Sequence, residues 1–440
     1  MKSKIYTFLR VSIHQHIANP EHFKQQLLSW SQQFREIVFL DSNSYPQEYS
    51  SFDCVLAVDA FTSLKTDFDN AFDDLKQYQQ TTKDWLFGYL SYDLKNDVEQ
   101  LTSSNFDGLD FPDLFFFQPK KIITLKGNEL EMKYLFLCDD EVEDDFEEII
   151  QTENDSFETL SNSGTFGEIK QRISKDLYVE KVTKMLEHIH KGDMYEANFC
   201  MEFFAENSII NPLEKFEKLN AISQAPFSVF FKNNKQFLLC ASPERYLKKA
   251  GETLISQPIK GTSKRFSDPV EDEKSKQFLE FDSKERAENI MITDLVRNDL
   301  SHTAQKGSVE VAELCKIYSF LQVHQMISTI TSKLDPQYSP IDVLRTTFPM
   351  GSMTGAPKIS VMKIIENLEE TKRGLYSGSI GYFTPEGDFD FNVVIRSILY
   401  NQENKYVSFS VGSAITAQSV PENEYEECLL KAKAMHEVLR

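Results

Sequence analysis

The stretch Ser256-Gln257-Pro258-Ile259-Lys260-Gly261-Thr262 follows an apolar run and places one lysine at the end of an expected strand. Pro258 cannot donate to a β-ladder, so the strand should end there or lie at an edge. Gly261 allows the backbone to turn closely around its neighbour. A lysine in an apolar setting loses its proton more easily, and a neutral amine is a nucleophile. Since most lysines are solvated surface charges, the interpretation of Lys260 depends on the rest of the sequence.

The length of 440 residues predicts two domains or one large elaborated domain. Residues 139–158 are rich in Asp and Glu and run into small polar residues at 161–164, which is typical of a solvated connection. We therefore expect an N-terminal region over 1–160 and a catalytic region over 161–440.

Charge and composition exclude several classes of protein. The net charge of -21 argues against a nucleic-acid surface. The six cysteines include no CxxC pair, so neither a zinc site nor a disulfide framework is expected. No stretch approaches the ~18 apolar residues of a membrane helix, and the N-terminus lacks a signal-peptide core. The sequence thus predicts a cytoplasmic protein, and an anionic substrate would need local cations or a metal ion.

Hydrophobic periodicity predicts the elements around the lysine. Helices are expected at about 174–190, ending at Gly192, and at 284–300 and 422–439. Strands are expected at 194–200 and 391–395, with a hairpin-like pair at 227–231 and 237–240.

Two pairs of glutamates stand at i,i+3 spacing on the two later helices. Glu288 points the same way as the apolar stripe of its helix, and Glu285 lies on the same face. Glu424 and Glu427 repeat the spacing on the C-terminal helix. One such pair is usually a surface feature, but two pairs meeting across a cleft could hold Mg²⁺ and, through it, an anionic substrate.

Two further features indicate an anion site. Residues 350–358 resemble a phosphate loop but lack the Gly-Lys of a Walker A motif, so they predict hydroxyls and amides at a helix N-terminus. Arg396 follows apolar residues, and its carboxylate partner could come from the protein or from a ligand.

Eight motifs occur in the order found in chorismate-utilising enzymes, and the chain resembles that family on them: PIKGT, SPER, KERAENIMITDLVRNDL, VHQMIST, FPMGSMTGAPK, GLYSGSIGYF, NVVIRS and VPENEYEE. The resemblance covers residues 170–440 strongly and the N-terminal half weakly, through GYLSYDL. It implies an α+β fold of two large packed antiparallel β-sheets flanked by helices, in which both halves of the sequence form one body.

Lys260 makes the chain most similar to the aminodeoxychorismate synthase component I branch, because anthranilate synthases usually have alanine there and isochorismate-forming members also lack the lysine. The resemblance implies that Lys260 attacks C2 of chorismate, that Glu244 is the general acid and base, and that ammonia then displaces the lysine. It further implies that Glu288 and Glu427, supported by Glu285 and Glu424, bind Mg²⁺. Substrate contacts are implied for Arg396, Tyr376, the amides near Gly412, Ser352 and His324.

No cysteine stands in a glutaminase-like context, so we expect ammonia from solution or from a separate glutamine amidotransferase subunit, component II. The leucine-glutamate-serine motif of feedback-inhibited anthranilate synthases is not apparent, which weakens a case for tryptophan inhibition. Two alternatives stay open: an anthranilate synthase component I that carries lysine, and a non-catalytic chorismate-binding regulator.

Overall fold

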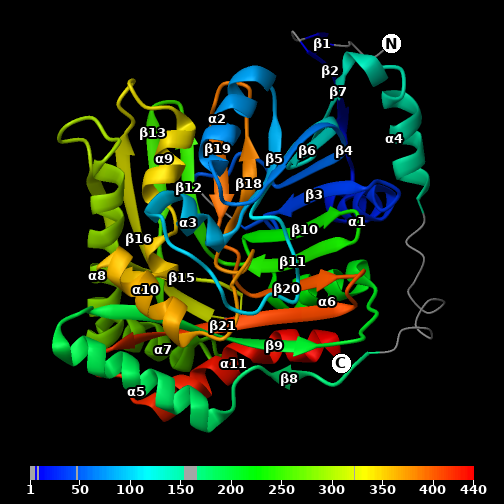
Figure 1. Cartoon of the computed structure of the whole chain (residues 1–440). Helices are drawn as coiled ribbons and strands as arrows, with labels where there is room; N and C mark the ends of the chain where they lie inside the picture. The colour runs from blue at the N-terminus through cyan, green and yellow to red at the C-terminus, as the bar shows by residue number, and fades with distance from the viewer. Residues whose placement is uncertain (1–4, 7–8, 46–47, 153–165, 322) are drawn as a thin grey trace.

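The computed structural model describes residues 5–6, 9–45, 48–152, 166–321 and 323–440. Figure 1 shows strands of both sequence halves side by side in one body. Two antiparallel sheets share the long strands β4 (Cys54–Thr66) and β6 (Leu114–Lys126). The C-terminal half of β6 pairs with β7 and its N-terminal half pairs with β5, so the two sheets diverge along this strand.

The first sheet contains most of the strands from the two ends of the chain. Its order beyond β6 on one side is β7 (Glu129–Leu135), β2 (Arg10–His16) and β1 (Ile5–Tyr6). Beyond β4 on the other side the order is β3 (Glu36–Asp41), β10 (Phe227–Asn233), β11 (Gln236–Ser242), β20 (Ser397–Asn401), β21 (Tyr406–Thr416) and β9 (Glu196–Ala205). The short strands β8 (Lys170–Gln171) and β17 (Gly355–Ala356) cover the outer edge of β9.

The second sheet carries the lysine stretch. From β6 it runs through β5 (Leu86–Leu90), β18 (Ser379–Phe383), β19 (Phe389–Asn392), β12 (Arg245–Ala250) and β13 (Thr253–Gln257) to β16 (Val323–Lys333). Strand β14 (Ile259–Lys264) continues along the edge of β16 that β13 occupies, and β15 (Glu310–Ser319) covers its other edge. Pro258 separates β13 from β14, as its missing donor requires.

Alternating side chains divide the interior into two large cores. In β3, Ile37 and Phe39 join a core between the first sheet and its helices, whereas Val38 joins a core between the two sheets. The helices are α1 (Pro20–Ser31), α2 (Ala71–Thr82), α3 (Lys95–Glu99), α4 (Val142–Gln151), α5 (Lys175–Lys191), α6 (Pro212–Ser223), α7 (Pro269–Phe281), α8 (Ser283–Ser301), α9 (Pro340–Thr347), α10 (Lys358–Leu368) and α11 (Pro421–Leu439). In Figure 1, α5 and α11 lie beneath β9 and β21.

The packed antiparallel sheets and their helices confirm the expected α+β class. The helices expected at 174–190, 284–300 and 422–439 are α5, α8 and α11, and Gly192 ends α5 at φ +85°. The strand expected at 391–395 is wrong, because β19 ends at Asn392 and Arg396 has φ +52°, outside extended geometry. The boundary expected near residue 160 lies outside the described residues. No described helix is long and apolar enough to span a membrane.

Candidate active site

Lys260 meets a glutamate that comes from the opposite sheet. Its Nζ donates a hydrogen bond of 2.8 Å to Oε1 of Glu196, and the side chains of the two residues are 11% and 1% exposed. Lys260 lies on β14 at the end of the second sheet, and Glu196 lies on β9 in the first. The ion pair therefore joins the far ends of the two sheets, where α8 and α11 also contribute side chains.

Backbone geometry fixes both members of this pair. Gly261 has φ +88°, and a Cβ there would lie 3.1 Å from Oε2 of Glu285, so a larger residue would be strained and crowded. Glu196 pairs with Ala356 of β17 on one side and Thr416 of β21 on the other. Position 355 requires glycine, because a Cβ there would lie 2.1 Å from the carbonyl oxygen of Glu196. The two side chains are thus presented to each other by rigid strands.

The surroundings of Lys260 are acidic, which corrects the expectation of an apolar setting that frees the amine. Burial acts to lower the pKa of Lys260, but the carboxylates of Glu196, Glu288 and Glu244 outweigh burial and raise it above its usual range. The raised pKa favours the ammonium form of Lys260, which needs a proton acceptor before it can act as a nucleophile.

Glu244 stands beside Lys260 in the short connection between β11 and β12. Its side chain is buried, with 4% exposure for the residue. Burial raises its pKa to about 7, although the Ser352 hydroxyl, the Lys260 ammonium and the Ile259 amide all favour the ionised form. A carboxyl that titrates near neutral pH can give and take a proton, which is the property of a general acid and base. Ser352, one of the expected substrate contacts, is thereby placed at the same point.

The four expected metal ligands come close together around one lysine. Lys284 Nζ lies 3.6 Å from Oε1 of Glu424 and 3.9 Å from Oε1 of Glu288. Burial lowers the pKa of Lys284, but the charges of Glu424, Glu288, Glu285 and Glu427 raise it above the usual value. Two helix faces, one on α8 and one on α11, therefore converge as the i,i+3 spacing predicts.

These residues fit a magnesium ion in the chemistry of their donors. Oε1 of Glu288 is buried and has no hydrogen-bond donor among the described residues, and burial raises the pKa of this carboxyl to about 7. A buried carboxylate oxygen without a hydrogen bond is costly unless a cation or proton comes close to it, and oxygen is the ligand atom that Mg²⁺ prefers. Within the described ranges, however, no three His, Cys, Asp or Glu side chains gather around one point as a metal-binding group.

Three of the expected substrate residues, Arg396, Tyr376 and Gly412, lie near the carboxylates of α11. Arg396 donates to the carbonyl of Lys431 at 3.4 Å, and burial lowers its pKa while Tyr376 and Glu427 act against burial. Lys431 in turn bonds to Glu427 at 2.6 Å and to the carbonyl of Gly412 at 2.8 Å. Arg396, Tyr376 and Gly412 are thus linked to the metal-side helix α11.

His324 is directed toward other partners. Its ring nitrogens lie 2.8 Å from the Ser319 hydroxyl and 3.2 Å from Oδ1 of Asp272, on the side of the sheet covered by α7. The next residue along β16, Gln325, is buried and has a side-chain oxygen without a hydrogen-bond donor among the described residues. Successive strand residues face opposite sides of a sheet, so Gln325 faces away from Asp272.

The sequence analysis missed Glu196 and Lys284. A carboxylate in the middle of the apolar strand expected at 194–200 was a signal for Glu196, since such a group requires a partner when buried. Lys284 opens the helix whose glutamates were noticed, and it became visible as their neighbour only when α11 was placed.

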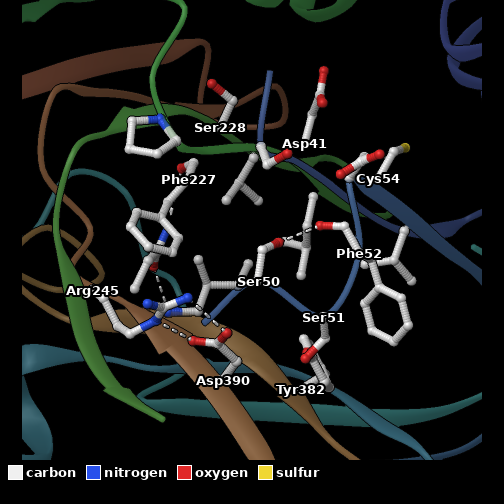
Figure 2. Close-up of a pocket in the computed structure, with 18 residues that line it drawn as sticks. Asp41, Ser50, Ser51, Phe52, Cys54, Phe227, Ser228, Arg245, Tyr382 and Asp390 are labelled. Carbon is white, nitrogen blue, oxygen red and sulfur yellow. Dashed lines mark hydrogen bonds and ion pairs between the residues drawn. The ribbon is translucent and has the colours of Figure 1, made fainter. Parts of the chain in front are cut away.

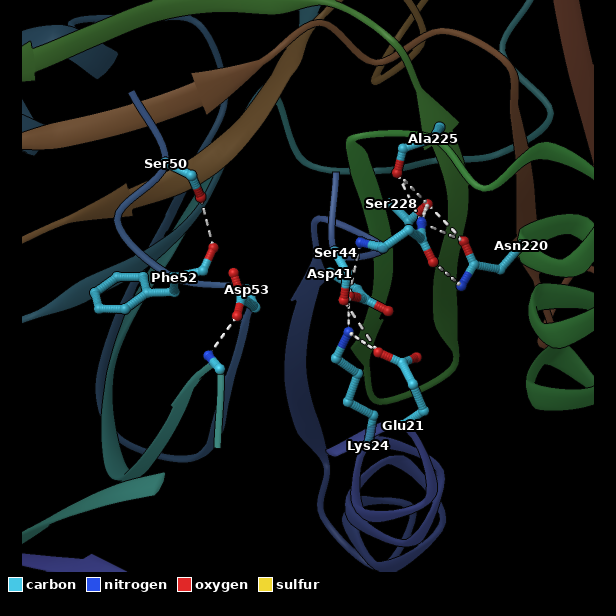
Figure 3. Close-up of polar contacts among 12 residues, drawn as sticks. Glu21, Lys24, Asp41, Ser44, Ser50, Phe52, Asp53, Asn220, Ala225 and Ser228 are labelled. Carbon is cyan, nitrogen blue, oxygen red and sulfur yellow. Dashed lines mark hydrogen bonds and ion pairs between the residues drawn. The ribbon is translucent and has the colours of Figure 1, made fainter. Parts of the chain in front are cut away.

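A second pocket, between β3–β4 and β10–β12, holds buried charges that are already matched. Figure 2 shows Arg245 facing Asp390, and their atoms lie 2.9 and 3.2 Å apart. Figure 3 shows Lys24 reaching Asp41, at 2.9 Å. We call these four residues the paired pocket. The carboxylates of Asp41 and Asp390 each have a cationic partner, so the ionic groups of the paired pocket are matched.

Comparison with known proteins identifies the family. The sequence model described as chorismate binding enzyme matches residues 35–437. The chain belongs to this family. Aminodeoxychorismate synthase component 1 of Bacillus subtilis (strain 168) is 31% identical over 388 residues, which cover 86% of this chain and 80% of that protein. Aminodeoxychorismate synthase, chloroplastic, of Arabidopsis thaliana is 34% identical over 382 residues, 82% of this chain.

The chain spans less than half of the plant relatives that it matches, 43% of the rice protein and 41% of the Arabidopsis protein. Among solved structures, anthranilate synthase component I from Streptococcus pneumoniae TIGR4 superposes with a TM-score of 0.78 at 24% identity, over 90% of this chain and 94% of that one. This likeness shows that the two chains share a fold.

Proposed function

We propose that this chain aminates chorismate at C4 to give 4-amino-4-deoxychorismate, with Lys260 as a covalent nucleophile. The observation that carries the proposal is the buried Lys260 ammonium held between Glu196 and the carboxyl of Glu244. The relatives from Bacillus and Arabidopsis are named aminodeoxychorismate synthases, which supports the same reaction. This activity belongs to the synthesis of 4-aminobenzoate and folate.

The two steps exchange one leaving group for another. The Lys260 amine forms a bond to ring C2 while the C4–O bond breaks, and the hydroxyl leaves as water with a proton from Glu244. Ammonia then bonds to C4, the C2–N bond breaks, and Glu244 takes a proton from the new ammonium. The pKa of Glu244 at about 7 suits both tasks at neutral pH.

Charged groups on α8 and α11 would hold the substrate. Glu288 and Glu427, with Glu285 and Glu424 beside them, would bind Mg²⁺, which when bound neutralises a carboxylate of chorismate. Arg396, Tyr376 and the backbone near Gly412 are proposed for the other carboxylate, and Ser352 for the ring. His324 is also proposed for the ring of the substrate, and its ring nitrogens contact Ser319 and Asp272 in this structure.

The ammonia is proposed to come from a separate glutamine amidotransferase in the cytoplasm. The six cysteines are buried, and none stands in a glutaminase-like context. The purified chain should therefore turn over with ammonium salts and not with glutamine. Robust turnover with glutamine alone would contradict this part of the proposal.

Product identification tests the proposed reaction. The purified chain is incubated with chorismate, Mg²⁺ and an ammonium salt, and the product is identified by mass and by fluorescence. A product that retains the enolpyruvyl group and carries nitrogen is expected. Fluorescent anthranilate would instead support the alternative reaction, and the absence of any conversion would support a binding protein.

A further inference from the structure

Glu196 is the carboxylate that Lys260 hydrogen-bonds, and the proposed reaction has so far given it no task. The acidic groups that face Lys260 come from four elements: Glu196 on β9, Glu244 before β12, Glu285 and Glu288 on α8, and Glu427 on α11. Of these, Glu196 makes the hydrogen bond of 2.8 Å. Its side chain is 1% exposed, so solvent cannot take its place.

The second oxygen of Glu196 is left open. Oε2 is buried and has no hydrogen-bond donor among the described residues. A buried carboxylate normally has both oxygens satisfied, and an acceptor left unmet in the interior is unfavourable. The strands β17 and β21 hold the backbone of Glu196 from both sides, so the side chain cannot easily turn to solvent. Glu196 therefore keeps one unfilled acceptor oxygen while its other oxygen holds the Lys260 ammonium.

The other carboxylates are committed elsewhere in the reaction. Glu244 must carry a proton when the hydroxyl leaves, so it cannot take the Lys260 proton at that moment. Glu285, Glu288 and Glu427 are proposed to face Mg²⁺, which favours their ionised forms. Of these five glutamates, Glu196 alone has neither task. It lies on strand β9, whereas the other four lie on α8, on α11 or in the β11–β12 connection.

We propose that Glu196 positions Nζ of Lys260 and takes the proton that this amine must lose before it attacks the substrate. The inference rests on the proposed function. The N–H bond of the Lys260 ammonium breaks, an O–H bond forms on Glu196, and the freed electron pair bonds to C2. When the C2–N bond breaks in the second step, the amine regains that proton from Glu196, so protons balance over the cycle.

Glu196→Gln tests this role, because glutamine keeps the size and one acceptor oxygen but cannot take the proton. We expect kcat to fall by about 100-fold or more at neutral pH, the usual contribution of a general base, with KM changed less than about threefold. The deficit should shrink as pH rises, since hydroxide can then deprotonate the lysine. Glu196→Asp should recover part of kcat.

The matched control is Glu202→Gln. Glu202 is a buried carboxylate of the same strand, bonded to Arg172 and Tyr406 away from the lysine. We expect this variant to keep kcat and its pH profile, even if its unfolding temperature falls. An equal loss of kcat in both variants would show a structural effect of buried charge and overturn the role of Glu196.

A second measurement needs no turnover. Amine-reactive labelling of Lys260 is followed by peptide mass against pH in substrate-free protein, with Lys260→Ala as the blank. We expect the pH midpoint of labelling to be lower by about one unit or more in Glu196→Gln, because the carboxylate no longer stabilises the ammonium. An unchanged midpoint would overturn the contact itself.

The outcomes separate this inference from the proposed function. No aminated product from the unmodified chain would remove the proposed function, while the labelling shift would still report on the pair. Aminated product with an unchanged kcat in Glu196→Gln would overturn only the role of Glu196.

Discussion

Two of the buried regions that carry charged side chains, the paired pocket and the surroundings of Lys260, balance their charges differently. In the paired pocket, Lys24 meets Asp41, and Arg245 and Lys248 both meet Asp390, so each of the two acids has a cation beside it. Around Lys260 and Lys284 the acids outnumber the bases: Glu196, Glu244, Glu285, Glu288, Glu424 and Glu427. Matched buried charges hold a structure together, whereas an excess of buried acid is unfavourable until a cation or a proton arrives. The difference indicates which region does chemistry.

The largest expected effect is on turnover at the acid-rich site. Lys260→Ala should lower the rate of amination with ammonia by at least about 1,000-fold, because the covalent route is lost. The fold should persist, since Lys260 lies at a strand end. Rates are measured by product mass, and Lys264→Ala, on the exposed end of the same strand, is the control. Turnover within tenfold of the unmodified chain would contradict a covalent lysine.

The paired pocket should respond in stability and not in rate. Lys24→Met removes the partner of the buried Asp41, and loss of one member of such a pair typically lowers the free energy of unfolding by about 3–5 kcal/mol. The rate with ammonia should stay within about twofold. Urea unfolding checks this, with the double substitution of Lys24→Met and Asp41→Leu expected to recover much of the loss. A decrease in kcat without a decrease in the free energy of unfolding in Lys24→Met would contradict a purely structural role for the paired pocket.

The free energy of unfolding should depend on pH because the site contains a buried carboxyl, Glu244, whose pKa is raised. The pKa of Glu244 rises from 4.5 to about 7 on folding, so the protonated carboxyl favours the folded state below about pH 4.5 and this contribution is lost as pH rises to about 7. Relative to Glu244→Gln, the unmodified metal-free chain should lose on the order of 2–3 kcal/mol across this window. Urea unfolding in a chelator at several pH values measures it. Glu252→Gln, in the exposed β12–β13 turn, is the control for the removal of one glutamate charge.

A smaller effect is expected on the metal requirement. Glu288→Gln, and likewise Glu427→Gln, should raise the Mg²⁺ concentration for half-maximal rate by about 10–100-fold and weaken chorismate binding with it. A magnesium titration of the rate gives the answer. Glu426→Gln is the control, because Glu426 lies on the same helix but bonds to Lys175 at the surface. A titration curve like that of the unmodified chain would exclude that residue as a ligand.

Local sequence patterns were enough to predict many of the helices and strands and to select several candidate site residues. The stripe of α8 and the i,i+3 glutamates of α11 are periodic features, so Glu288 and Glu427 could each be placed on one face of a helix from the sequence. Pro258 marked the break between β13 and β14 for a chemical reason that needs no tertiary context. The ring of side chains around Lys260 could not be derived in this way, since it depends on how the two sheets meet.

The failures have the same cause. Lys260 was expected among apolar groups because Ile259 and Gly261 flank it, whereas its partner Glu196 lies 64 positions earlier in the chain. Arg396 follows apolar residues that resemble a strand, but the chain turns there at positive φ.

The most direct test of the central claim is the mass of Lys260 itself. The purified chain is mixed with chorismate and Mg²⁺ in the absence of ammonia, quenched, and digested, and the peptide that contains Lys260 is weighed. The covalent account predicts that this peptide gains the mass of one chorismate less one water, and that added ammonium discharges the adduct as aminated product. A chain that aminates chorismate while the Lys260 peptide never gains mass, at any quench time, would contradict it.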